Sequence, residues 1–340
     1  MPLNTRLKRI LRSNEFIAFI FIIGVSAVFA TINPVFYSTR NIFELIRSLT
    51  VNLIFGCGIM MIIVNGGVDL SFMAIAVVTS YLTMQGAILI GYDGGILFIF
   101  LFAAIMGMVI GFFNAYMISK FEMPVFIVTL SVNTVIRGLV LAFIGNEYIA
   151  SSHMPSSTIE FSRNFIFRRV SEGGATYGLH ISIFISLGVL LITHLILNYT
   201  TFGRGVYALG GDAVSASRIG YNLKKVRLFI FGYAGFLAGI AGILYVSQNR
   251  MADPISFQGQ ELGVIAAVVI GGTRFSGGKG SVISVFLGVL LTQLILNNLI
   301  LIGVPSFWHR FTFGALVIIA VILQSSREQG VFKMKRAKRE

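Results

Sequence analysis

The sequence predicts an all-α, polytopic membrane protein with about ten transmembrane helices and both termini in the cytoplasm. Of its 340 residues, 56% are hydrophobic and only 11% are charged, and the mean hydropathy is +0.88. These three values lie outside the range of soluble globular domains. In addition, long apolar stretches alternate with short polar segments, and a spanning helix needs about 20 mainly apolar residues. We therefore expect residues 1–340 to form a single transmembrane domain.

The basic residues indicate the orientation of the spans. The first apolar run, 16–32, follows a basic segment, but it is long for a signal-peptide core and lacks a clear cleavage site, so it is expected to be a retained span. With the amino terminus inside, most of the 26 Lys and Arg residues fall in cytoplasmic segments. The ten expected spans are 16–32, 45–64, 71–90, 95–118, 124–145, 180–198, 226–247, 260–273, 281–303 and 308–324.

Two connecting segments are long enough to have a structure of their own. The outer segment 146–179 is polar enough to face water and to receive an external partner. The segment 203–227 is basic and lies on the cytoplasmic side. The net charge is +13, and the basic residues lie in short clusters beside the apolar spans rather than along one surface stripe. They therefore indicate topology and not nucleic-acid binding. The single cysteine, Cys57, excludes an intrachain disulfide.

The cytoplasmic segment predicts one short helix at about 212–220. Asp212 is suited to cap its amino terminus, and Ala213 and Ala216 fall within it. Gly220 is suited to the left-handed conformation that ends a helix. Such a helix on the cytoplasmic side is expected to contact a cytoplasmic protein.

The segment NGGVDLS at 65–71 places an acid and consecutive glycines between two apolar runs. Charged groups near the hydrocarbon usually line water or protein, and Gly-interrupted spans can mark a transport site. Asp69 is therefore a candidate for a gating role. The alternative is an ordinary inner loop in which Asp69 caps the third span.

The fifth span carries polar residues on one face. Thr129, Asn133 and Arg137 recur every four residues and therefore share a helical face that should avoid lipid. Arg137 needs a carboxylate, carbonyl groups or water as a partner. It either lines the outer half of a pathway, locks helices together or extends its charged end outward to the membrane surface.

The ninth span offers a second polar pair. Gln293 and Asn297 are also four residues apart. Their neutral amides suit either hydroxyl groups of a ligand or hydrogen bonds between helices.

The sequence contains no recognisable catalytic or metal motif. The segment GGTRFSGGKGS at 271–281 fails the phosphate-loop pattern, because Thr273 stands where Gly is required and Gly280 where Ser or Thr is required. It is either a loop or part of a broken helix. The histidines are scattered over different segments, so we expect no catalytic residue, no metal site and no cofactor on this chain.

Taken together, four motifs resemble those of the permease subunits of bacterial ABC-type monosaccharide importers, a family that includes ribose, galactose, xylose and galactofuranose permeases. The resemblance extends over about residues 40–324. Its motifs are GGVDLS at 66–71, MPVFIVTLSVNTVIRGL at 123–139, GRGVYALGGDAVSASRIG at 203–220 and ELGVIAAVVIGGTRFSGGKGS at 261–281.

The resemblance implies a multi-pass protein of the bacterial inner membrane that works with several partners. These are an ABC ATPase subunit that binds ATP and Mg, an extracytoplasmic sugar-binding protein, and a second copy of the permease or a homologous permease. It also implies that residues 212–220 form the coupling helix. The ATPase-coupling residues expected on this basis are Gly203, Gly210, Gly211, Asp212, Ala213, Ala216 and Gly220.

Three other functions remain open at this stage. A related ABC permease for nucleosides or for autoinducer-2 would share the same general motifs. A secondary transporter driven by an ion gradient would need acids in the spans, and Asp69 and Glu261 come nearest. A membrane-embedded transferase would need clustered loop carboxylates or a metal motif, and neither is evident.

Overall fold

A computed structural model describes residues 14–170, 174, 176–305 and eight further positions up to residue 322. The two chain termini, and with them the predicted cytoplasmic ends, lie outside the described residues. Most of the tenth expected span, 308–324, does so as well.

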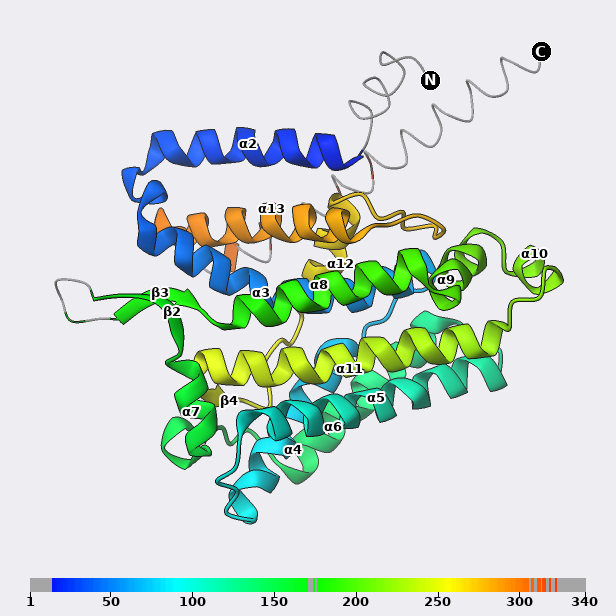
Figure 1. Cartoon of the computed structure of the whole chain (residues 1–340), viewed down its shortest axis with the longest axis horizontal. Helices are drawn as coiled ribbons and strands as arrows, with labels where there is room; N and C mark the ends of the chain where they lie inside the picture. Colours follow the sequence, from blue (N-terminus) through cyan, green and yellow to red (C-terminus); the bar gives the residue numbers. More distant parts are fainter. Residues whose placement is uncertain are drawn as a thin grey trace.

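The described residues form a bundle of long helices that run roughly along one direction (Figure 1). Eight helices in this part of the chain are long and apolar enough to cross a membrane. They confirm the predicted helical, polytopic class. They are α2 (Asn14–Ile32), α3 (Thr39–Val64), α4 (Phe72–Leu89), α5 (Ile96–Lys120), α6 (Val125–Phe143), α8 (Ser182–Tyr199), α11 (Leu223–Asn249) and α13 (Val282–Leu301).

The expected eighth span, 260–273, is not a continuous spanning helix. Its helix, α12 (Glu261–Ile270), has 10 residues. At a rise of 1.5 Å per residue it covers about 15 Å, half of a hydrocarbon core of about 30 Å. Between α11 and α12 the chain contains only the two-residue strand β4 (Met251–Ala252) and turns. Such irregular backbone is tolerated at membrane depth only where protein or water surrounds it.

The centre of the bundle is held together by close contacts between small residues. The helices α5 and α11 cross with their backbones almost touching, since a Cβ atom at Gly107 would lie 2.1 Å from the carbonyl oxygen of Gly235. The helix α11 also packs against α3 and α4. Without a large hydrophobic driving force between membrane helices, such close approach is a main source of helix association.

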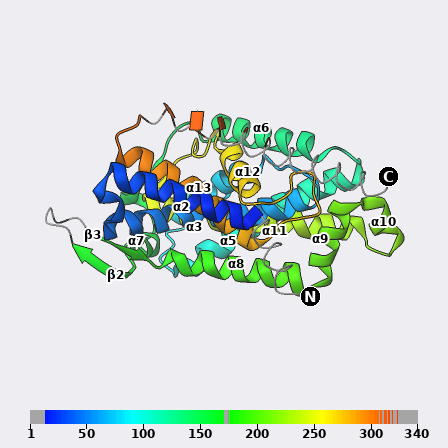
Figure 2. The same cartoon turned by 90° about the horizontal axis from the view of Figure 1, so that it is seen from above.

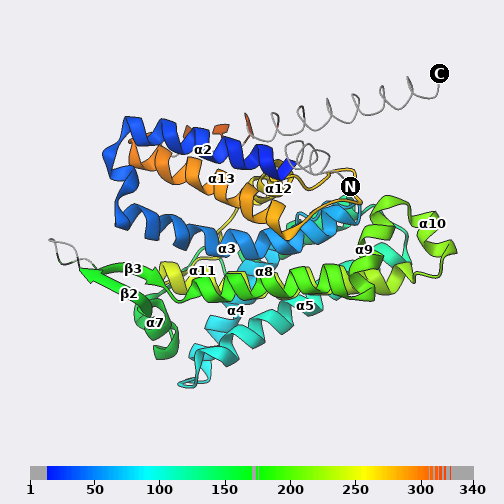
Figure 3. The same ribbon diagram turned by 45° about the horizontal axis from the view of Figure 1, so that its top comes forward.

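The helices fall into two packing groups that meet where α3 contacts α11. In the first group, α13 packs against α2, α3 and α12. The contact between α12 and α13 is tight, because a Cβ atom at Gly288 would lie 1.8 Å from the carbonyl oxygen of Ala267. In the second group, α4, α5 and α11 pack together and α6 contacts α4 and α5. Figure 3 shows α2 and α13 on one side of the bundle and α4 and α5 on the other.

The two ends of the bundle carry different short elements (Figure 1). At one end, which we call the α10 end, α8 leads into α9 (Thr201–Gly211) and α10 (Ala213–Arg218). At the opposite end, the hairpin end, lie the short elements of the expected outer segment 146–179 and of the turn after α2. These are η1 (Pro34–Tyr37), β1 (Ile149–Ala150), η2 (Ser151–His153), α7 (Ser156–Ser162), β2 (Phe165–Val170) and β3 (Thr176–His180).

The strands are a departure from the all-α expectation. β2 and β3 form an antiparallel pair, and β1 pairs with β4 in the same manner. The sequence of β2, FIFRRV, does not alternate between apolar and polar residues, and five of its six residues are exposed. It therefore lacks the period of two that identifies a half-buried strand.

Candidate functional site

The short helix expected in the segment 203–227 is present as α10, at the tip of the α10 end. Asp212 lies at its amino terminus and accepts hydrogen bonds from the backbone N–H of Val214 at 3.0 Å and from the hydroxyl of Ser215 at 2.6 Å. These bonds, the one from Ser215 first, lower the pKa of the Asp212 carboxyl below its usual value. The carboxylate thus satisfies a free N–H group of the first helical turn.

The far end of α10 also has the expected conformation. Gly220 has a φ angle of 95°, in the left-handed region that glycine adopts without strain. Ala216 is buried, whereas the side chains of Val214 and Ile219 are 61% and 72% exposed. An apolar pair exposed beside basic residues at the end of a bundle is typical of a contact surface for another protein.

Three glycine-rich segments meet at the end of α9, next to the start of α10. Gly210 belongs to α9, Gly66 to the segment after α3, and Gly277 and Gly278 to the segment 271–281. A Cβ atom at Gly210 would lie 1.6 Å from the carbonyl oxygen of Val64 and 2.8 Å from the nitrogen of Gly278. We call these four glycines the glycine junction. Only residues without a side chain allow three backbones to approach this closely.

Hydrogen bonds tie the same three segments together. The N–H of Gly278 donates to the carbonyl of Val64 at 2.8 Å, and the hydroxyl of Tyr207 on α9 donates to the carbonyl of Gly280 at 2.8 Å. Gly203 serves another contact, since a Cβ atom there would lie 2.3 Å from the carbonyl oxygen of Ile196 at the end of α8. At Gly211, by contrast, a Cβ atom would have open space around it, with no atom within 4 Å outside its own neighbours among the described residues.

Asp69 lies in a buried polar network beside the glycine junction. Its side chain is 2% exposed and accepts hydrogen bonds from the N–H and the hydroxyl of Ser71, both at 2.6 Å. The amide of Asn114 on α5 donates to the same hydroxyl at 2.9 Å. Burial raises the pKa of the Asp69 carboxyl to about 6, and the bonds from Ser71 oppose that rise. This geometry is that of a local turn that starts α4.

If the chain has the transport role that its sequence predicts, Asp69→Asn should retain uptake within about twofold, because an amide oxygen can accept the same two bonds. Asp69→Ala should instead destabilise the fold by about 1–3 kcal/mol, because it leaves buried donors unpaired. Uptake in membrane vesicles and thermal unfolding of the purified chain measure the two effects. A total loss of uptake in Asp69→Asn with an intact fold would show that the carboxylate itself takes part in transport.

Arg137 forms an ion pair in the interior of the bundle. Its guanidinium Nη2 lies 2.7 Å from the carboxylate Oε1 of Glu261, and the two side chains are 18% and 10% exposed. Its Nε donates to the Oδ1 of Asn133 at 2.9 Å. Arg137 is about 18 Å from the start of α6 at 1.5 Å per residue. Arg137 thus pairs with an acid on α12, and Asn133, on the same face of α6, accepts a second hydrogen bond from its guanidinium group.

The other predicted polar residues have separate contacts. The hydroxyl of Thr129 accepts from the N–H of Leu70 at 3.2 Å and thus holds the start of α6 to the segment with Asp69. Asn297 donates to the hydroxyl of Ser48 at 2.8 Å and links α13 to α3. Asn297 thus shows the interhelical hydrogen bond that was one of its two expected roles. Gln293 is half-buried on α13, and its role stays a prediction.

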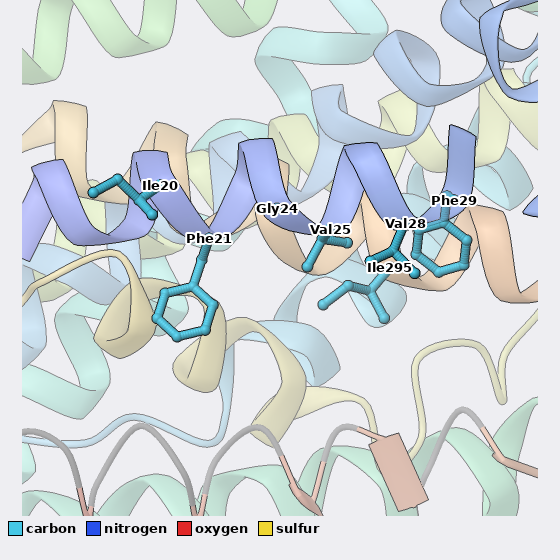
Figure 4. A pocket seen from close by; sticks show the side chains of 7 residues that line it. All are labelled: Ile20, Phe21, Gly24, Val25, Val28, Phe29 and Ile295. Atoms are coloured by element: carbon cyan, nitrogen blue, oxygen red, sulfur yellow. The ribbon is translucent and has the colours of Figure 1, made fainter. Parts of the chain in front are cut away.

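An open groove on the surface is apolar throughout. Its volume is about 610 Å³, and α2 supplies most of its wall (Figure 4). The groove is lined by Ile20, Phe21, Gly24, Val25, Val28, Phe29 and Ile295. It offers no side-chain donor or acceptor, so it does not suit a polar solute. Among the described residues, no group of three or more His, Cys, Asp or Glu side chains could hold a metal ion.

The sequence interpretation missed the pairing of Glu261 with Arg137. The available signal was charge complementarity, because Glu261 opens an otherwise apolar stretch and Arg137 lies within an apolar span. It also missed the glycine junction, since nothing in a single sequence shows which glycine-rich segments meet. Of the predicted site residues, Asp69, Thr129 and Gly210 lie near one another at the α10 end of the bundle. Asn297 is not among them, since it contacts Ser48 on α3.

Several curated proteins are similar to the chain over most of its length. The ribose import permease protein RbsC of Haemophilus influenzae is 30% identical over 92% of this chain and 93% of that protein. RbsC of Bacillus subtilis is 34% identical over 91% of each. The L-arabinose ABC transporter permease protein AraH of Azospirillum brasilense is 29% identical over 91% of this chain and 87% of that protein.

No solved structure matches the chain significantly. A family model described as "branched-chain amino acid transport system / permease component" matches residues 41–321. The matched region includes α10, the glycine junction and the Arg137–Glu261 pair. The chain therefore belongs to this family of transport-system permease components.

Proposed function

We propose that this protein is the permease subunit of an ATP-driven importer that moves a monosaccharide, a pentose or a hexose, across the bacterial inner membrane. The observation that carries the proposal is the capped helix α10, which exposes Val214 and Ile219 at one end of a bundle of membrane helices. The similarity to ribose and arabinose permeases over about nine-tenths of the chain supports the substrate class.

In this proposal the α10 end faces the cytoplasm and docks on a separate ABC ATPase subunit, which holds ATP and Mg. Exposed basic residues in 203–227 agree with that side of the membrane. The hairpin end then faces outward, toward an extracytoplasmic sugar-binding protein. A second copy of the permease, or a homologous one, completes the membrane part. Movement of α10 passes through the glycine junction to α3 and to the segment that precedes α13.

The chain provides a path rather than catalysis. The glycine-rich segment 271–281 packs against α9 and the end of α3, so its glycines serve close packing and not the binding of phosphate. ATP hydrolysis belongs to the partner subunit.

A neutral sugar fits the charges in the bundle better than a free amino acid does. An amino acid carries an ammonium and a carboxylate group, which need opposite charges when they leave water. The interior pair Arg137 and Glu261 neutralise each other. The name of the matched family includes branched-chain amino acids, and related permeases for nucleosides or autoinducer-2 are further alternatives, so competition for uptake has to decide among these ligands.

An ion-coupled secondary transporter is the alternative from another class. It requires an acid that exchanges a proton or a sodium ion during the cycle. Asp69 is engaged by Ser71, and Glu261 is engaged by Arg137. These contacts give both carboxylates structural partners and favour the ATP-driven importer.

The first experiment is to purify the tagged chain from its native membrane in mild detergent and to identify the soluble proteins that accompany it by mass spectrometry. Recovery of an ABC ATPase is the expected result. Uptake of labelled ribose in competition with hexoses, nucleosides, leucine and autoinducer-2 then identifies the ligand. Reproducible absence of an ATPase from an intact, monodisperse preparation, with uptake that follows an ion gradient, would overturn the proposal.

A further inference from the structure

The Arg137–Glu261 ion pair joins a helix of one packing group to a helix of the other. Arg137 lies on α6, which packs against α4 and α5 in one group. Glu261 is the first residue of α12, which packs against α3 and α13 in the other. Figure 2 shows α6 and α12 on the same side of the bundle, opposite α8. The 2.7 Å contact between the two side chains therefore bridges elements whose packing partners differ.

The cost of this pair argues against a purely structural purpose. Removing two charges from water is expensive, and well-packed apolar residues of similar volume are often as stabilising as an interior ion pair. The two side chains are not fully buried, at 18% and 10% exposure, so water can reach them when they separate. Water that solvates the separated charges lowers the cost of breaking the pair, so the pair can open and re-form during a conformational cycle.

The helix α12 connects this pair to the α10 end. Its first residue carries the Glu261 carboxylate, and its last turn runs into the segment 271–281, which contains Gly277 and Gly278. Gly278 bonds to Val64 and touches Gly210 on α9, and α9 is followed directly by α10. A displacement of α10 thus reaches Glu261 through one close-packed junction and one helix of about 15 Å.

We propose that Arg137 and Glu261 form a latch, in which the closed ion pair holds α6 to α12 and its opening lets α6 and α12 move relative to each other during the transport cycle. Both are positioning residues for transport and do not need to bind the sugar. The inference rests on the proposed function, because it assumes that α10 receives the movement of an ATPase. It gives α12, a helix too short to span the membrane, the role of a lever between the glycine junction and the latch.

The test uses the complete importer complex in proteoliposomes. It compares the single variants Glu261→Gln and Arg137→Gln with a double variant, the exchanged pair, that carries both Arg137→Glu and Glu261→Arg. The exposed pair Arg40–Glu44 on α3, with a contact of 2.9 Å, supplies the matched control through Arg40→Gln. Sugar uptake, ATP hydrolysis with and without loaded binding protein, and the yield of assembled complex are measured. Each single variant should assemble, and its uptake should fall by roughly tenfold, the size of effect typical of lost coupling between sites. Its ATP hydrolysis should no longer depend on the binding protein.

The exchanged pair should restore both uptake and the dependence of ATP hydrolysis on the binding protein, while Arg40→Gln should match the wild type. Single variants with wild-type uptake would overturn the latch. So would single variants that fail to assemble, because the pair would then serve fold stability, and so would an assembled exchange variant that stays uncoupled. A wild-type complex whose ATP hydrolysis is unaffected by any loaded binding protein would instead contradict the proposed function.

Discussion

Replacing Gly210 with alanine is expected to lower sugar uptake by at least about tenfold, the size of effect typical of lost coupling between sites. The added Cβ atom would lie 1.6 Å from the carbonyl oxygen of Val64 and 2.8 Å from the nitrogen of Gly278. Both are backbone atoms, so no side chain can turn away to make room. The glycine junction must widen, and overpacking of this kind costs about 1–3 kcal/mol.

Gly211→Ala is the matched control for Gly210→Ala. The two glycines are adjacent in α9, and alanine favours helix equally at both. In the described part of the chain, no atom outside its neighbours lies within 4 Å of a Cβ atom at Gly211, so uptake should remain within about twofold of the wild type. Uptake in vesicles and the amount of folded protein in the membrane are the measurements. Equal uptake in both variants would show that close packing at the junction is not needed for transport.

This pair of variants also separates two glycines that the sequence placed in one functional group. The motif around Gly210 and Gly211 marks both residues equally, because a linear pattern carries no information on distance. In the structure, an added Cβ atom at Gly210 would collide with the backbone of two other segments, whereas one at Gly211 would not. Gly203 has a third role, against the end of α8. Motif matching therefore finds the right region, and only the fold distinguishes its members.

Features that depend on local chemistry could be predicted from the sequence. The cap at Asp212 and the left-handed Gly220 follow from short-range rules and are both present. The long apolar spans likewise follow from the length of a membrane helix. The eighth expected span, 260–273, was wrong as a spanning helix: α12 starts as expected, at Glu261, but it ends at Ile270 and is too short to cross the membrane. The strand β2 escaped prediction because it is exposed on nearly every residue.

Contacts between residues far apart in the sequence could be identified only from the structure. Arg137 and Glu261 are separated by 124 positions, and a requirement for some partner was all that Arg137 implied. Asp69 had two open roles, and its bonds to Ser71 describe a turn at the start of α4. In both cases the residue type showed that the side chain requires a polar or charged partner, and only the fold showed which group is that partner.

Asp212→Lys is expected to abolish uptake while leaving the membrane bundle folded. A lysine cannot accept the bonds that Val214 and Ser215 now donate to the carboxylate, and a positive charge is unfavourable at the amino terminus of a helix. The six-residue helix α10 is too short to form without such support. Because Asp212 is exposed, its replacement does not disturb the core, and the defect should be confined to contact with the ATPase.

Asp212→Asn is the control, since asparagine caps helices about as well as aspartate. It should keep uptake and ATPase recovery near the wild-type level. Asp212→Lys should reach the membrane in normal amount yet recover at least about tenfold less ATPase in detergent, as expected when a central contact of an interface is lost. Wild-type uptake in Asp212→Lys would remove α10 from the coupling path. Loss of the ATPase in both variants would instead show that the ATPase contacts the charge of Asp212. In Asp212→Asn the helix α10 would still be capped, and yet it would not bind the ATPase.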